Sequence, residues 1–168
     1  LVSSRFFRQA LADELAGNPK FQDDDATVVP ALLFPRATVE TQGRDPLSRS
    51  TGVLLIGANQ DFWELGDASA RPQPMPGADE IVLNSTLASE LGVQVGDKIP
   101  VSTATAFTLD NPPLRLQVAG VLATTETPDD EAIFVDLETT WIIEGFGHGH
   151  VRGAQHGSPE AKLYTDIT

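Results

Sequence analysis

Apolar residues fall into short runs bounded by turn-forming residues, which is typical of the strands of a small β-rich domain. The alternation of apolar and polar positions is clearest within Leu114–Thr124. The other predicted strands are Thr27–Thr41, Thr51–Ala58, Glu80–Leu83, Lys98–Phe107 and Ala132–Val135, and Lys162–Thr168 has the pattern of a further strand's beginning. Because Pro30 and Pro35 interrupt the first run, we expect them at a sheet edge or at a bulge.

Three segments have apolar residues at helical spacing instead. Ser3–Ala16 predicts an amphipathic helix that ends at a Gly-Asn-Pro sequence. Asn84 is placed to cap a helix over Ser85–Leu91, and the glycine that follows is typical of a helix end. The third predicted helix is Leu137–Glu144.

The sequence Asn84-Ser85-Thr86 permits a second interpretation, because it also matches the N-glycosylation pattern. We favour the capping role, since a helical apolar pattern follows at once.

The mixture of elements predicts the α+β class. We expect a mixed, largely antiparallel sheet with two or three packed helices, in one domain over residues 1–168. Within it, residues 1–22 carry slightly more basic than acidic side chains, and residues 145–159 are rich in glycine and histidine and have the composition of a flexible loop.

Composition removes several classes of protein. The 168 residues include no cysteine, which excludes disulfide scaffolds, thiolate metal sites and cysteine nucleophiles. The 24 acidic and 11 basic residues give a formal charge of −13, which argues against a nucleic acid partner. No known catalytic motif or phosphate-binding loop is present, so we predict no catalytic residue, no cofactor site and no enzyme activity.

The acidic charge is concentrated in one stretch. No Lys or Arg occurs between Leu116 and Val151, whereas seven acidic residues do. This stretch is either a solvated surface or a docking surface for a basic partner. If partners dock, we expect them at Asp129–Glu131 or at the proline-rich loop that contains Met75, whose flexible thioether suits an adaptable contact. The alternative is that both are ordinary loops.

All three histidines, His148, His150 and His156, lie within the glycine-rich stretch. Imidazole is a common ligand of zinc, copper and nickel, and carboxylates such as Asp129, Asp130 or Glu144 would add oxygen ligands. The competing interpretation is a flexible polar loop, since closing it on a metal costs conformational entropy. We predict no metal site, and keep a periplasmic metal-binding or metal-sensing module as the alternative function.

Three segments taken together are similar to a known family. Glu80–Val101 (EIVLNSTLASELGVQVGDKIPV) reads as strand, capped helix, turn and strand, and it is followed by Leu114–Trp141 (LRLQVAGVLATTETPDDEAIFVDLETTW). Gly52–Leu65 (GVLLIGANQDFWEL) precedes both. This order resembles the extracytoplasmic, periplasmic core domain of FtsX/MacB-like ABC transporter permeases.

The resemblance implies a non-catalytic domain that couples ATP hydrolysis on a cytoplasmic ATPase subunit to the handling of a partner or substrate outside the membrane. It implies a second permease copy as partner, with a periplasmic adaptor or lipoprotein as a further one. The location would be the periplasmic side of the bacterial inner membrane, with residues 1–22 next to the bilayer. No apolar run here would cross a bilayer, and the chain begins with Leu1, so we expect transmembrane helices encoded outside this sequence.

Overall fold

A computed structural model describes residues 10–22, 27–41, 49–65, 75–103, 113–124, 126 and 128–144. The strands in these ranges are β1 (Ala31–Glu40), β2 (Arg49–Ala58), β3 (Glu80–Asn84), β4 (Lys98–Thr103), β5 (Leu114–Leu122) and β6 (Ala132–Asp136). The helices are α1 (Ala10–Ala16), α2 (Pro19–Gln22), α3 (Gln60–Glu64), α4 (Ser85–Leu91) and α5 (Leu137–Ile143), with a 3₁₀ turn, η1, at Pro128–Glu131. Each strand lies within or close to a predicted one, whereas α2 and α3 were not predicted.

The strands close on themselves in the order β1-β2-β6-β3-β5-β4. The pairs β2–β6 and β3–β5 are parallel, and the remaining neighbours are antiparallel. Closure depends on a short contact, since β1 meets β4 only through the residues Ala37 to Val39. The predicted α+β class with a mixed, largely antiparallel sheet is confirmed, and α3, α4 and α5 each contribute buried side chains.

The core follows the alternation seen in the sequence. Two alternate residues from each strand belong to one buried cluster, as expected of the inward-facing side chains of a closed sheet. Helix α4 adds Leu87, Ala88 and Leu91 to this cluster, and α5 adds Ile143. These helices therefore pack against the sheet through their apolar faces.

A second buried cluster joins residues of four strands and α3: Ile56, Ala58, Trp63, Val82, Leu122, Ala132 and Phe134. Helix α3 contributes Trp63, whose ring meets the Phe134 ring edge-on, with 5.4 Å between centroids and 78° between planes. Helix α3 is thereby fixed next to the ends of β2 and β6.

Pro35 lies where the pairing of β1 with β2 shifts, between Phe34 and Ala37. Proline cannot donate a ladder hydrogen bond, so an irregular position in the ladder accommodates it. The predicted bulge is therefore confirmed at Pro35, while Pro30 precedes the strand.

Helix α4 has the two ends predicted from sequence. The Asn84 side chain accepts a hydrogen bond of 2.7 Å from the Thr86 N–H, and Gly92 at the other end has φ of 66°. Asn84 is only 1% exposed, and its Nδ2 donates to Asp130 at 2.9 Å. Since a glycan would have to attach to this buried nitrogen, the geometry favours the capping role.

Changing Gly92 to alanine should cost about 1 kcal/mol, because a Cβ there is strained by the left-handed backbone conformation. No atom lies within 4 Å of the added Cβ, so steric overlap contributes nothing. Urea unfolding measures the loss, and Gly92→Asn should lose less because asparagine tolerates this conformation better. Equal losses for both variants would contradict this explanation.

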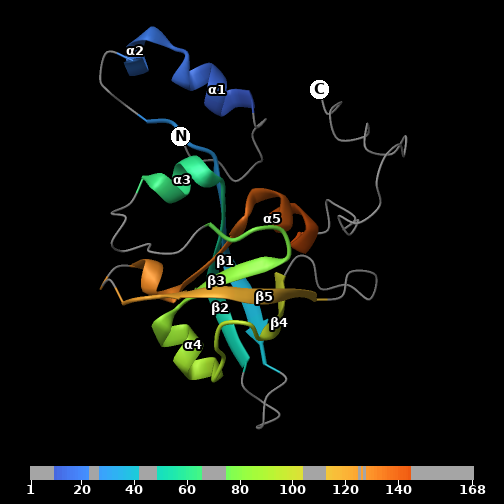
Figure 1. Ribbon diagram of the computed structural model, residues 1–168. Helices are drawn as coiled ribbons and strands as arrows, with labels where there is room; N and C mark the ends of the chain where they lie inside the picture. Colours follow the sequence, from blue (N-terminus) through green and yellow to red (C-terminus); the bar gives the residue numbers. More distant parts are fainter. Residues whose placement is uncertain are drawn as a thin grey trace, which may run out of the picture.

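Helix α1 covers the described part of the predicted helix Ser3–Ala16 and contributes no buried side chain. Together with α2 it stands apart from the sheet (Figure 1). No helix in the described ranges is long and apolar enough to cross a membrane.

Candidate functional site

Two parallel strands end side by side and turn directly into helices. In the pairing of β2 with β6, Ala58 lies opposite Asp136, the last residue of each strand. Asn59 then caps α3, and Asp136 itself caps α5. The ends of adjacent parallel strands thus lie at one edge of the sheet, with two helix starts beside them.

Side-chain hydrogen bonds fix both helix starts. The Asn59 Oδ1 accepts from the Phe62 N–H at 3.0 Å. The Asp136 Oδ1 accepts from the Thr139 N–H at 2.8 Å, and its Oδ2 accepts from the Thr139 hydroxyl at 2.6 Å. A capping residue of this kind stabilises a helix by about 1 kcal/mol, so the backbone at this edge is well defined.

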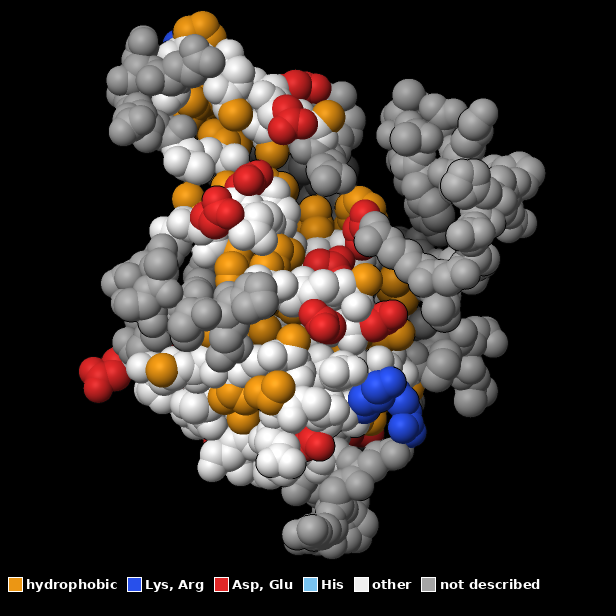
Figure 2. All heavy atoms as spheres, in the orientation of Figure 1, with side chains coloured by type: hydrophobic (Ala, Val, Ile, Leu, Met, Phe, Trp, Pro, Cys, Tyr) orange, Lys and Arg blue, Asp and Glu red, His pale blue; other side chains and the backbone are white. Residues whose placement is uncertain are grey.

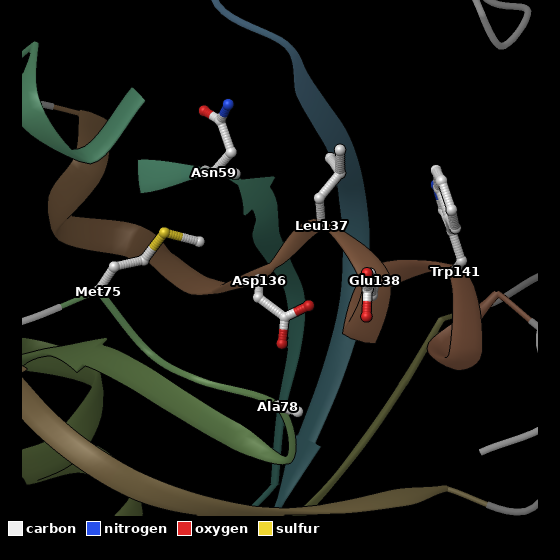
Figure 3. A pocket seen from close by; sticks show the side chains of 8 residues that line it. Asn59, Met75, Ala78, Asp136, Leu137, Glu138 and Trp141 are labelled. Atoms are coloured by element: carbon white, nitrogen blue, oxygen red, sulfur yellow. The ribbon is translucent and has the colours of Figure 1, made fainter. Parts of the chain in front are cut away.

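A surface hollow of about 310 Å³ lies at this edge. Its lining comes from the end of β2, the segment before β3, and the first turns of α5. The residues are Ala58, Asn59, Met75, Ala78, Asp136, Leu137, Glu138 and Trp141. In Figure 3, Met75 reaches in from one side and Trp141 stands on the other, with Asp136 and Glu138 between them.

The lining combines apolar surface with negative charge. Met75, Leu137 and Trp141 supply the apolar part, and Asp136 and Glu138 supply two carboxylates. Acidic side chains recur across the surrounding face among apolar ones, and Lys and Arg are sparse among the described residues there (Figure 2). Such a surface offers recognition of a group that is both cationic and apolar.

The two predicted docking places have different outcomes. Met75 lines the hollow, next to carboxylates from the later part of the acidic stretch. In Asp129–Glu131, by contrast, Asp130 has a structural role: its Oδ1 accepts from Asn84 at 2.9 Å, and its Oδ2 from the Glu126 N–H at 2.8 Å. Glu131 is exposed to solvent, and the side chain of Asp129 lies outside the described part.

The alternative metal function gains no support. His148, His150 and His156 lie outside the described residues, as do all of residues 145–159 and the predicted strand Lys162–Thr168. Among the residues that the structure does describe, no group of three metal-ligating side chains comes together. Glu144, considered as an oxygen ligand, is the C-cap of α5.

Sequence reasoning missed Asn59 and the residues of α5 as parts of a hollow. Leu137 and Trp141 are four positions apart, a spacing that places them on one face of a helix. That spacing was available in the sequence, as was Asn59 as a possible cap for α3. The parallel pairing that brings these segments to Met75 has no local sequence signal.

Two solved structures show a distant likeness. One is the periplasmic region of MacB from Actinobacillus actinomycetemcomitans, with 10% identity and a TM-score of 0.42 over 77% of this chain and 54% of that one. The other is a domain assigned to a permease of Porphyromonas gingivalis, with 12% identity and a TM-score of 0.45 over 74% of this chain and 57% of that one. The chain thus spans a little over half the length of each.

Comparison with curated proteins found no match. The sequence profile of one family, described as the MacB-like periplasmic core domain, matches residues 3–159. This match covers nearly all of the chain and confirms the resemblance carried by Glu80–Val101 and its neighbouring segments. The chain belongs to the family of MacB-like periplasmic core domains.

Proposed function

We propose that this chain is the non-catalytic extracytoplasmic domain of an ABC transporter permease subunit. It transmits movements driven by ATP hydrolysis on a cytoplasmic subunit to a partner or substrate outside the membrane. The observation that carries the proposal is the family match over residues 3–159.

The fold suits transmission of movement. A closed sheet with a continuous core resists internal deformation, because packed interiors are nearly as dense as crystals. Movement at one edge of such a body therefore displaces the whole domain. Because such a rigid body deforms little, a displacement applied at one edge reaches the opposite edge almost unchanged.

The proposal includes partners and a location. A second permease copy would pair with this one in the bacterial inner membrane, and a periplasmic adaptor or lipoprotein would contact the domain. Residues 1–22 would lie next to the bilayer, residues 145–159 would form a loop, and transmembrane helices would be encoded on both sides of this sequence. Sequencing the flanking coding DNA tests the last point, since a soluble sequence on both sides would contradict it.

Nucleotide should change the distance between two copies of this domain in the full-length permease. These 168 residues include no cysteine, so once any cysteines elsewhere in the permease are replaced, Glu90→Cys places one spin label at an exposed position of α4 in each copy. Pulsed electron paramagnetic resonance should then show a shifted inter-copy distance when ATP and vanadate are added to the transporter with its ATPase subunit.

The matched control carries labels at Glu90→Cys and Glu126→Cys within one copy, diluted with unlabelled permease. Both sites are exposed on the same rigid domain, so this distance should stay constant with nucleotide. Unchanged inter-copy distances in an ATP-hydrolysing transporter would overturn the coupling role.

A further inference from the structure

We infer that the hollow at the ends of β2 and β6 is a docking site for a protein segment that inserts a Lys or Arg side chain next to an apolar residue. The inference goes beyond the proposed function and stands on the hollow itself. It can therefore fail while the permease assignment holds.

Charge complementarity defines the polar part of the occupant. Asp136 and Glu138 both line the hollow, and none of the residues lining it is Lys, Arg or His. The neighbouring chain is also negatively charged, since no basic residue occurs from Leu116 to Glu144. A cation placed here meets two carboxylates and no like charge from the lining, which favours a basic over an acidic partner.

Apolar contacts define the rest of the occupant. Lys and Arg have aliphatic stems that pack along apolar surface while their charged heads meet carboxylates. Leu137 and Trp141 provide such a surface on one face of α5, and the indole ring of Trp141 attracts cations. Met75 faces them across the hollow (Figure 3) and adapts its shape to a neighbouring side chain.

The size favours side chains of a protein segment over a large small molecule. Pockets for drug-sized ligands have volumes of roughly 300–1,000 Å³, and this hollow of about 310 Å³ is at the lower limit. It accommodates one long side chain and part of its neighbour. The segment's backbone would then remain on the surface, next to the exposed residues Gly77 and Ala78.

The site is ordered before binding. The Asp136 carboxylate is fixed by its two hydrogen bonds to Thr139, at 2.8 and 2.6 Å, and has further lone pairs for an incoming donor. Helix α5, which carries Glu138 and Trp141, is anchored by the buried Thr140 and Ile143. Little of the site must be immobilised on binding, which lowers the cost of association.

Nuclear magnetic resonance titration of the 168-residue chain tests the inference. The probe is the blocked tetrapeptide acetyl-Gly-Arg-Phe-Gly-amide, and its matched control replaces Arg by Glu. We expect the first to shift the amide signals of Asp136–Trp141 with a Kd on the order of 1 mM, weakening as salt is added. The acidic peptide should cause no saturable shift at these residues.

Variants then separate the site from nonspecific attraction to an acidic protein. Asp136→Asn keeps a capping side chain and Glu138→Gln keeps the side-chain shape, so neither variant should unfold the domain. Each removes one negative charge from the hollow and should raise the Kd of the Arg peptide about fivefold. Glu90→Gln on α4 removes an equal charge elsewhere and should leave the affinity unchanged. Equal weakening by all three variants would overturn the site.

Other occupants give distinct results. If phenethylammonium chloride binds as tightly as the Arg peptide, the natural occupant is a small organic cation and not a protein segment. If the signals of Asp136–Trp141 shift with the concentration of the chain in the absence of peptide, the occupant is a second copy of this chain. No shift with up to 10 mM Arg peptide, set at about ten times the expected Kd, would overturn the inference altogether.

Discussion

Replacing Gly57 with alanine should lower the free energy of unfolding by about 3 kcal/mol. Gly57 is buried in β2, between Leu32 of β1 and Val135 of β6. A Cβ at this position would lie 2.8 Å from the Cβ of Thr140 in α5 and would overlap the Thr140 hydroxyl. Atoms do not approach so closely, so α5 would have to move away from the sheet.

Thr140 has no room to turn aside. It is fully buried, and its hydroxyl donates a hydrogen bond of 3.1 Å to the carbonyl oxygen of Asp136. The added methyl group must therefore displace the helix backbone or break this bond. Either change costs more than a methyl group gains by burial.

A double-mutant cycle measured by urea unfolding checks this explanation. Thr140→Gly alone should be destabilising, because it removes a buried side chain and adds a flexible residue to a helix. The pair Gly57→Ala with Thr140→Gly should lose clearly less than the sum of the two single losses, since the second change removes the overlapping atoms. Additive losses would show that Gly57 is required for another reason.

The same contact positions the hollow. Because β2 lacks a side chain at Gly57, α5 lies close against the ends of β2 and β6, and its first two turns bring Glu138 and Trp141 to the hollow that Met75 also lines. A displaced helix would carry both residues away from Met75. Binding of the Arg peptide should therefore weaken in Gly57→Ala even at temperatures where the domain remains folded.

Local sequence patterns were sufficient to predict most of the secondary structure. The strand β5 follows from alternation, α4 from its cap at Asn84 and its glycine end, and the bulge of β1 from Pro35. In each case the signal lies within a few neighbouring residues, where steric preferences and hydrogen bonds act directly. The short helix α3 was missed because five residues are too few for a periodic pattern.

Pairing between distant segments could not be predicted in this way. Nothing near β2 indicates that β6, many residues later in the chain, is its parallel neighbour. The hollow depends on that pairing, so the sequence did not predict it; of the lining residues, only Met75 was considered as a docking residue, because of its flexible thioether. Similarly, Asp130 looked like a docking residue because charge patterns do not show which carboxylates are used inside the fold.

Replacing Asn84 with alanine should lower the free energy of unfolding by about 2 kcal/mol. The loss of the hydrogen bond to the Thr86 N–H removes the cap of α4, worth about 1 kcal/mol. The Asp130 Oδ1, which accepts from the Asn84 amide at 2.9 Å, also loses this hydrogen bond, and the loss of one hydrogen bond to a half-buried charged group costs about the same again.

Asn84→Ser separates the contribution of the cap from that of the hydrogen bond to Asp130. Serine caps helices nearly as well as asparagine but is too short to reach Asp130. We expect it to lose about half as much as Asn84→Ala by urea unfolding. In the Asp130→Ala background, where no link remains to be lost, Asn84→Ser should cause almost no loss. If Asn84→Ser is as damaging as Asn84→Ala, the cap contributes no stability and the whole loss comes from the link between α4 and Asp130. If Asn84→Ser is harmless, the link contributes no stability in solution.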